Sequence, residues 1–397
     1  MRRYPSLFYY LALANFLFFL GNSLYILLPI FLKNLGASES YIGIVNNVDK
    51  VFSIIAAVGV GSIMHGRDRI RLLRLGYLIL VIAYSSYLFI SSLTWMLLAI
   101  RIVHGIGFSI AMILGTSIVF DIVSIKDAAE AIGLYGITGA MSNALSPFFG
   151  ELMLSRGYSH YLIFALSVLL VSLSLGITFI MPRARQHNPS SVRPIRRGSL
   201  HLFANPRFLY IVLATIIFGG GFGVIVTYLP NFIRTTTNYN FSYFFIIYIS
   251  VLIIIRFTFI KSVGLMSRNI LLMVVFSIGA LMNLFLNYLN SKIILLAVSI
   301  MYGITHGVLY PILNTIMVSM VPSHDRGKAN ALFTASFNGG MMIFALTLGF
   351  LIDYAGTYLA AFDVCTVMFI LAVVLLAFMT ARHGNLDVID DEVLTVE

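Results

Sequence analysis

The sequence predicts an all-α polytopic membrane protein, with twelve transmembrane helices in two pseudo-symmetric six-helix bundles. Apolar residues make up 60% of the chain and charged residues 10%, whereas a soluble domain has roughly 45–50% and about 25%. Apolar runs recur along the whole chain, each near the roughly 20 residues that a helix needs to cross a bilayer. Because lipid cannot pair backbone N–H and C=O groups, we expect each run to be a helix.

Charge clusters and Gly, Pro, Asn and Ser residues divide the apolar runs into twelve spans. In the first half we expect spans near 8–32, 41–64, 72–92, 95–120, 131–154 and 161–181. In the second half we expect spans near 208–233, 240–262, 268–290, 293–320, 329–354 and 357–381. The first span is too long for a signal peptide and lacks a small-residue cleavage site, so we interpret it as an uncleaved helix.

The chain divides into four predicted parts and shows an internal repeat. We expect an N-terminal bundle over 1–181, a cytoplasmic linker over 182–207, a C-terminal bundle over 208–381 and an acidic cytoplasmic tail over 382–397. The segment LPIFL at 28–32 matches LPNFI at 229–233, and Gly105-Ile106 matches Gly303-Ile304 at a similar offset. Two six-helix bundles related by a parallel repeat are the plan of alternating-access carriers.

Lysine and arginine are distributed unevenly between the predicted loops. With the N-terminus inside, eighteen of the 25 lie on the cytoplasmic side, four on the opposite side, and Lys50, Arg101 and Arg256 within spans. Lys and Arg collect in cytoplasmic loops, so we expect both termini in the cytoplasm and a multi-pass protein of the plasma (cytoplasmic, bacterial inner) membrane. Anionic lipid heads account for the net charge of +10, so we expect no nucleic-acid partner.

Other classes of function are disfavoured by what the sequence lacks. A single cysteine, Cys365, permits neither an internal disulfide nor a cysteine metal cluster. The sequence contains no Gly-x-x-x-x-Gly-Lys-Ser/Thr loop for ATP and no recognisable catalytic set, so we expect no cofactor, no metal and no enzyme. The expected partners are a small-molecule substrate, protons and membrane lipids, and we expect a monomer.

Several short motifs occur within the predicted helices and in the loops that join them. They are RIVHGIG at 101–107, with Arg101, Gly105 and Gly107; AAEAIGLYG at 128–136; DRGKA at 325–329, with Asp325, Arg326 and Gly327; GSIMHGRDR at 61–69, with Gly61, His65, Arg67, Asp68 and Arg69; and ALSPFFGE at 144–151, with Pro147 and Gly150. In these motifs the chain resembles the major facilitator superfamily over residues 8–381, and within it the efflux and sugar-and-drug antiporter branches.

The resemblance implies a secondary active transporter that moves a small solute by alternating access, coupled to protons, with efflux favoured. An uncoupled uniporter or a non-transporting receptor of the same fold remains an alternative. Two departures from the family pattern bear on mechanism. His65 occupies the Asp position of the gating loop, which in the family pairs charges between the halves, and Ser146 replaces a Gly of the antiporter motif.

Charges inside the spans are the candidates for coupling, because an ionisable group at mid-bilayer costs roughly 2.5–3.5 kcal/mol and needs a partner. Asp49 and Arg101 have similar predicted depths, and their helices belong to one bundle in the family fold, so we expect a charge pair. His104 follows on the same helical face as Arg101 and could relay a proton. Alternatively, Arg101 clamps helices and His104 only packs. Lys50 is rotated about 100° from Asp49 on an ideal helix, so we expect that the two do not both face one partner.

Polar residues within other spans are candidates for a substrate cavity. These are Asn22, Tyr25, Asn47, Asn143, Asn283, His306, Tyr310 and Asn314. Basic side chains and histidines outnumber carboxylates in the spans. The sequence therefore favours an anionic or neutral polar substrate over a lipophilic cation.

Overall fold

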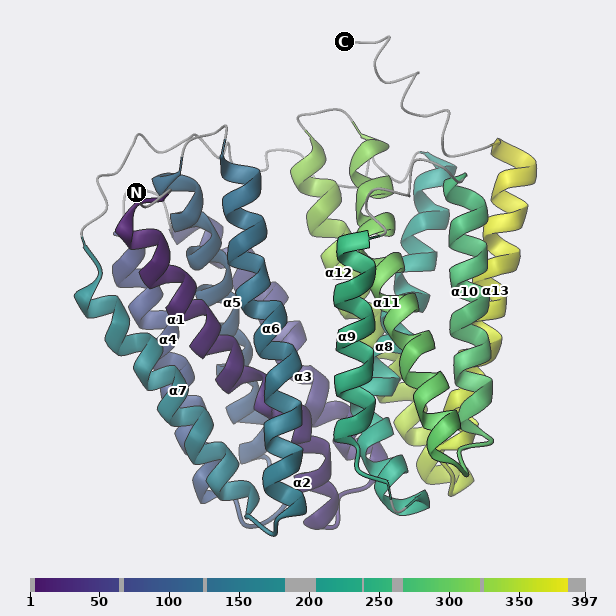
Figure 1. Ribbon diagram of the computed structural model, residues 1–397, viewed down its shortest axis with the longest axis horizontal. Coiled ribbons are helices and arrows are strands. Elements are labelled where there is room, and N and C mark those ends of the chain that lie inside the picture. Colours follow the sequence, from purple (N-terminus) through teal and green to yellow (C-terminus); the bar gives the residue numbers. More distant parts are fainter. Residues whose placement is uncertain are drawn as a thin grey trace. The chain divides into compact units, whose positions relative to one another are not determined.

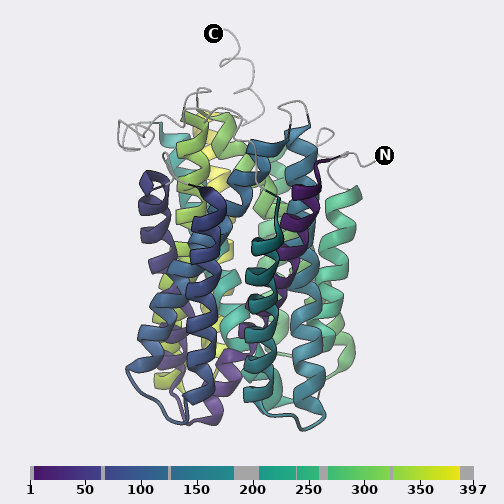
Figure 2. The ribbon, with the colours of Figure 1, turned by 90° about the vertical axis from the view of Figure 1, so that its left-hand side faces the viewer.

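The computed structural model describes residues 4–63, 68–123, 127–182, 205–237, 239–258, 267–321 and 325–384. Within these ranges every regular element is a helix (Figures 1 and 2). Nine of the described helices are long and apolar enough to cross a membrane, and Ser242–Arg256 is a shorter apolar helix. The predicted all-α membrane fold with twelve helices in two pseudo-symmetric bundles is confirmed.

The described residues form two compact units. Unit 1 contains residues 4–37 and 45–182, and unit 2 contains residues 38–44 and 205–384. One boundary falls inside a helix, so the first turns of that helix are part of unit 2 while the rest is part of unit 1. The four-part division made from the sequence stays a prediction.

Unit 1 supplies the first six spans. Its elements are α1 (Ser6–Ser23), the 3-10 turn η1 (Leu24–Leu27), α2 (Leu28–Asn34), most of α3 (Glu39–Ile63), α4 (Arg69–Ser86), η2 (Tyr87–Phe89), α5 (Met96–Ile122), α6 (Ala128–Ser155) and α7 (His160–Ile180). The segment Ser6–Asn34 forms one span, which tightens at η1 just before Pro29. Proline lacks an N–H to donate and suits the first turn of a helix, so the span restarts there as α2.

Unit 2 supplies the other six spans. They are α8 (Pro206–Thr236), α9 (Ser242–Thr258), α10 (Arg268–Leu286), α11 (Lys292–Ser319), α12 (Arg326–Ala355) and α13 (Leu359–His383). In both units the described helix ends lie close to the predicted ones. Among the ends that the structure describes, the largest differences are at the C-terminal ends of α4, six residues short of the prediction and followed by η2, and of α10, four residues short.

The helix pairings of unit 1 recur in unit 2. In unit 1, α1 packs on α6 and α7, while α4 packs on α5 and α7. In unit 2, α8 packs on α12 and α13, while α10 packs on α11 and α13. In each unit, the first span therefore packs on the fifth and sixth spans, and the third span packs on the fourth and sixth. The repeat found in short sequence matches is therefore a repeat of packing.

Glycines bring α8 and α12 together within unit 2. A Cβ added to Gly219 or Gly223 would overlap backbone atoms of Phe337 or Met341 in α12, and one added to Gly340 would overlap the backbone of Ile216 in α8. Small residues that let backbones approach are a usual device of membrane helix packing. The glycine run of α8 is thus a packing surface, and the aromatic and aliphatic core of unit 2 surrounds it.

Candidate functional site

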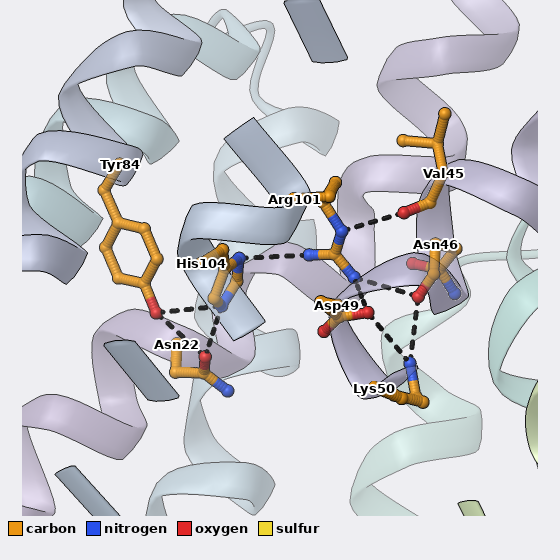
Figure 3. Close-up of polar contacts among 8 residues, drawn as sticks. All are labelled: Asn22, Val45, Asn46, Asp49, Lys50, Tyr84, Arg101 and His104. Atoms are coloured by element: carbon orange, nitrogen blue, oxygen red, sulfur yellow. Dashed lines mark hydrogen bonds and ion pairs between the residues drawn. The ribbon is translucent and has the colours of Figure 1, made fainter. Parts of the chain in front are cut away.

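The centre of the candidate site is an ion pair between α3 and α5 in unit 1 (Figure 3). Arg101 Nη2 lies 2.6 Å from Asp49 Oδ1, and the arginine side chain is only 3% exposed. The same guanidinium donates from Nε to the Val45 carbonyl at 2.8 Å and from Nη2 to the Asn46 carbonyl at 2.9 Å. One arginine of α5 is therefore bound to a carboxylate and two backbone carbonyls of α3. It acts both as a charge partner and as a clamp between helices.

A glycine makes this short distance possible. Gly105 lies one helical turn after Arg101, and a Cβ at that position would overlap the backbone carbonyl of Asp49. The two backbones can therefore approach closely at this level of the bundle. Gly107 has the same role toward α4, where an added Cβ would meet Leu80 and Ile79 at 2.9 and 3.0 Å.

His104 continues the polar network from the ion pair toward α1 and α4 (Figure 3). Arg101 Nη1 lies 3.1 Å from His104 Nδ1, and His104 Nε2 lies 2.9 Å from Asn22 Oδ1. Because a guanidinium only donates, Nδ1 accepts the bond and the ring proton is on Nε2, where it is donated to Asn22. The Tyr84 hydroxyl donates to the same Asn22 oxygen at 2.8 Å. Asp49, Arg101, His104, Asn22 and Tyr84 thus form one continuous chain of polar contacts.

Lys50 pairs with Asp49 itself, and the structure gives the two side chains no shared ion-pair partner among the described residues. Lys50 Nζ lies 3.6 Å from Asp49 Oδ1 and donates to the Asn46 carbonyl at 2.9 Å. The helical rotation separates the two Cβ atoms, but the four-carbon lysine side chain is long enough to fold back along the helix. Asp49 therefore has two cationic neighbours, and the cluster carries a net positive charge.

The other cavity candidates of unit 1 surround this network. Tyr25 is buried, with its ring centroid 5.3 Å from that of His104 and stacked at 5.5 Å on Phe164. Asn143 accepts a hydrogen bond from the Ser23 hydroxyl. Asn47 is 1% exposed in α3. Asn22 and Tyr25 both contact His104.

The four cavity candidates of unit 2 have different surroundings. His306 Nδ1 lies 2.6 Å from the hydroxyl of Tyr248, a residue that the sequence did not single out. Tyr310 and Asn314 line a cavity of about 560 Å³. Asn283 is fully buried and donates to the Gly279 carbonyl of its own helix at 2.9 Å. It lines neither of the two cavities described in unit 2.

The gating-loop residues that the structure describes have local partners within unit 1. Asp68 precedes α4 and caps it by accepting from the Ile70 and Arg71 N–H groups at 3.0 and 3.3 Å. Arg69 pairs with the Asp121 carboxylate of α5 and donates to the Ser117 hydroxyl at 2.7 Å. Gly61 lies near the C-terminal end of α3, while His65 and Arg67 are outside the described residues.

The remaining motif residues have structural contacts. In α6, Pro147 is inside the helix and an added Cβ on Gly150 would meet Leu24 at 3.2 Å. Ser146, where the family motif has glycine, donates its hydroxyl to the Leu20 carbonyl of α1. In unit 2, Asp325 is the N-cap residue of α12, and its carboxylate accepts a hydrogen bond from Lys328 Nζ at 2.6 Å. Arg326 and Gly327 are the first two residues of that helix.

Sequence reasoning missed a polar cluster in unit 2 at the start of α3. Asp353 of α12 accepts the backbone N–H groups of Glu39 and Ser40 at 2.7 and 2.8 Å. The Tyr358 hydroxyl donates to the Glu39 carboxylate, and the Tyr228 hydroxyl donates to the Glu39 carbonyl at 3.1 Å. An acidic residue in the first turn of α3 was a visible signal, but its partners are more than 180 residues away in sequence.

Comparisons with known proteins support the fold that this geometry forms. A model of the Major Facilitator Superfamily matches residues 11–291 and 263–391. The nucleoside transporter NupG has a similar structure, with a TM-score of 0.81, 13% identity, and coverage of 95% of this chain and 99% of that one. A D-xylose-proton symporter has a TM-score of 0.74 and 15% identity, with coverage of 93% of this chain and 96% of that one. A bacterial homolog of the human lysosomal transporter Spinster, in an inward-facing and unoccupied conformation, has a TM-score of 0.69 and 14% identity. The match covers 98% of this chain and 97% of that one. No curated protein matches the chain in sequence.

Proposed function

Because the chain belongs to the Major Facilitator Superfamily, we propose that it is a secondary active transporter, moving a small polar solute by alternating access and coupling that movement to protons. The family marks the chain as a multi-pass membrane transporter and not an enzyme. Coupling is assigned to Asp49, Arg101 and His104, and a fold alone does not specify it.

The contact between Asp49 Oδ1 and Arg101 Nη2 at 2.6 Å carries the coupling proposal. Charges inside a bilayer are costly unless they are paired. A proton delivered to Asp49 would cancel its charge and weaken its hold on Arg101, which would keep its two backbone carbonyl partners. His104, Asn22 and Tyr84 provide a hydrogen-bonded route to the pair. Protonation would thus loosen the contact of α3 with α5 and make the conformation of unit 1 sensitive to protons.

Proteoliposomes carrying Asp49→Asn test this role. The variant keeps the shape and one oxygen of Asp49 but cannot exchange a proton. We expect it to exchange substrate across the membrane and to lose accumulation driven by a pH gradient. Asp363→Asn, an exposed aspartate of α13, is the matched control and should accumulate substrate normally. Unchanged accumulation by Asp49→Asn would contradict the coupling role.

The same assay separates the alternative functions. A wild-type protein that exchanges substrate but never accumulates it against a gradient would be an uncoupled uniporter. Flux no higher than that of empty vesicles would instead indicate a receptor-like member of the fold. Either outcome replaces the proposal of a coupled transporter.

We propose a neutral polar or anionic substrate. In the coupling network and the cavity of unit 2, the described charged groups are mainly basic, with Lys50, Arg101, Arg256 and Arg268 against Asp49. His104 and His306 add proton-accepting rings. Two of the structurally similar proteins are by name a nucleoside transporter and a xylose symporter. Counterflow with uridine and xylose, and with ethidium as a lipophilic cation, tests the class. Transport of ethidium alone would contradict it.

We propose export, with both termini in the cytoplasm and the chain acting as a monomer. The antiporter-like motif around Pro147 supports export, and the excess of Lys and Arg in the loops of one side supports the orientation. The same bias supports a cytoplasmic linker at 182–207, a cytoplasmic tail at 382–397 and a location in the plasma membrane. Active uptake into everted but not right-side-out vesicles is the expected result, and protease-accessible tags on opposite faces would contradict the topology.

A further inference from the structure

Unit 2 contains a cavity that the coupling network does not use. It has a volume of about 560 Å³ and lies among the C-terminal end of α9, the first residue of α10 and the second half of α11. This volume is within the range of small-molecule sites, roughly 300–1,000 Å³. A second cavity of about 350 Å³ shares Asn314 and Thr315 with the first. The two cavities are therefore adjoining parts of one recess.

The charged groups that the structure describes in this recess are cationic. Arg256 and Arg268 line the first cavity and Arg326 lines the second, and no carboxylate is among the described residues that line either. The nearest acidic residue in sequence, Asp325, is paired with Lys328 at 2.6 Å. Planar guanidinium groups bind phosphate and carboxylate oxygens in pairs of hydrogen bonds. The recess is thus suited to an anion.

Arg256 is a cation of this recess for which the described residues provide no partner. It lies in the last turn of α9, a helix that is otherwise apolar. Within the part of the chain that the structure describes, Arg256 forms no ion pair and no hydrogen bond. A cation at the end of a membrane helix is stabilised by an anionic partner. An anion in the cavity would supply one.

Neutral polar groups in the same recess indicate that the anion carries hydroxyl groups. The buried Oδ1 of Asn314 accepts no hydrogen bond from a described residue. Pro311 has no N–H to donate to the carbonyl of Gly307 one turn earlier, and both residues line the cavity. Two acceptors without their usual donors, beside guanidinium groups, match a ligand that has both oxyanion and O–H groups.

We propose that this recess binds a small phosphate ester with free hydroxyl groups, with Arg256 as its main counter-ion, Arg268 as a second, and Asn314 and the Gly307 carbonyl as partners of the hydroxyls. A phosphate dianion fits several guanidinium groups better than a single carboxylate does. The chemistry is shared by a soluble sugar or polyol phosphate and by the headgroup of phosphatidylglycerol. If the ligand is soluble, the inference rests on the proposed transport function and names its substrate class.

Binding can be measured without transport, so failure of this inference and failure of the proposed function are distinguishable. The probes are sn-glycerol 3-phosphate, inorganic phosphate and glycerol, titrated into the full-length protein in a neutral detergent at fixed ionic strength. A ligand that binds only the folded state raises the melting temperature. We expect saturable stabilisation by glycerol 3-phosphate, weaker stabilisation by phosphate and none by glycerol.

Variants identify the site. Arg256→Gln should weaken glycerol 3-phosphate binding at least tenfold. Arg256→Lys should weaken it less, because lysine keeps the positive charge but loses the planar guanidinium that donates two hydrogen bonds to one phosphate. Asn314→Leu should reduce the preference for glycerol 3-phosphate over phosphate. Lys292→Gln removes an exposed charge from the first residue of α11, at the other end of that helix, and should bind as the wild type does. If Arg256→Gln does not fold, Arg256→Lys and Arg268→Lys give the same comparison.

A lipid arm distinguishes the two sources of the phosphate group. Nanodiscs of phosphatidylglycerol are compared with nanodiscs of phosphatidylcholine, for the wild type and for Arg256→Lys. Stabilisation by the soluble probe identifies a solute site, and stabilisation by phosphatidylglycerol alone, reduced in the variant, identifies a lipid site. No stabilisation by either probe, or equal binding by wild type and the Arg256 variants, would overturn the proposal.

Discussion

The side-chain carboxylate of Asp353 caps the helix that begins at Glu39. Its Oδ1 accepts the Glu39 N–H at 2.7 Å, and its Oδ2 accepts the Ser40 N–H at 2.8 Å. The first turn of a helix has N–H groups with no partner inside the helix, and a negative charge there is favourable. A residue of α12 thus caps the first two N–H groups of α3, while Ser38, directly before the helix, accepts the N–H of Tyr41 at 3.2 Å.

Replacing Asp353 with Asn should destabilise the protein by about 1 kcal/mol, within the range of roughly 0.5–2 for helix caps. The amide retains one acceptor oxygen but loses the charge and the second bond. Thermal unfolding in detergent measures the change, and amide hydrogen exchange in the first turn of α3 should speed up. Asp363→Asn, an exposed carboxylate of α13, should leave that turn protected. Equal exchange in both variants would contradict the capping role.

Tyr358 should make the stability of the protein sensitive to alkaline pH. Burial, followed by the hydrogen bond to the Glu39 carboxylate, raises the pKa of Tyr358. An unfolded tyrosine titrates near pH 10, so the raised pKa contributes stability that is fully present below about pH 10 and is lost as the pH rises through the folded pKa. Wild type and Tyr358→Phe should therefore differ most near neutral pH and converge in alkali.

Melting temperatures measured from pH 7 to pH 11 check this expectation. The exposed Tyr354 lies in the last turn of α12, and Tyr354→Phe is the control, with a curve that should run parallel to that of the wild type. Curves for wild type and Tyr358→Phe that stay parallel across the whole range would show that the hydroxyl does not act through its own titration.

The ion pair of unit 1 should behave as a coupled unit in a double-mutant cycle. Arg101→Gln should cost about 3–5 kcal/mol, because it breaks a buried pair and removes the side-chain donor of the Val45 carbonyl. Asp49→Asn should cost about 1–3 kcal/mol, since Arg101 keeps its carbonyl partners. The double variant should be more stable than the sum predicts, by about 0.5–3 kcal/mol. Strictly additive losses would mean that the two side chains act independently.

The close approach of α3 and α5 should depend on Gly105. Gly105→Ala places a Cβ against the Asp49 carbonyl and should destabilise the protein by about 1–3 kcal/mol, as overpacking of a core does. Gly133→Ala in α6 is the matched control, because an added Cβ there meets no atom within 4 Å. It should be neutral or slightly stabilising. Equal effects of the two substitutions would argue against a tight contact at Gly105.

The fold was predictable because lipid constrains each crossing strongly. A helix in a bilayer needs about 20 apolar residues and pairs its own backbone, so length and composition locate it without knowledge of its neighbours. The span predicted at 208–233 is α8 at Pro206–Thr236, and the span predicted at 95–120 is α5 at Met96–Ile122. The small errors at helix ends arise because caps and turns, rather than hydropathy, determine where a helix stops.

The site was predictable only in part. Asp49 and Arg101 could be paired because charges within apolar spans are few and their depth can be counted along the helix. Lys50 could not be placed, because its position depends on side-chain torsions rather than on helical rotation. The contact between Asp353 and Glu39 spans 314 residues and uses backbone donors, which have no sequence signature. Contacts of this kind follow from packing and are visible only once the helices are assembled.

Lys50 has a consequence for the synthesis of the chain. It lies next to Asp49 in sequence and 3.6 Å from its carboxylate, whereas Arg101 follows about fifty residues later. The ribosome therefore produces Asp49 together with a neighbouring counter-charge, before the helix that carries its arginine has been translated. Insertion of nascent α3 should accordingly depend on Lys50, and Lys50→Gln should lower the yield of inserted protein more than it lowers the melting temperature of the finished one.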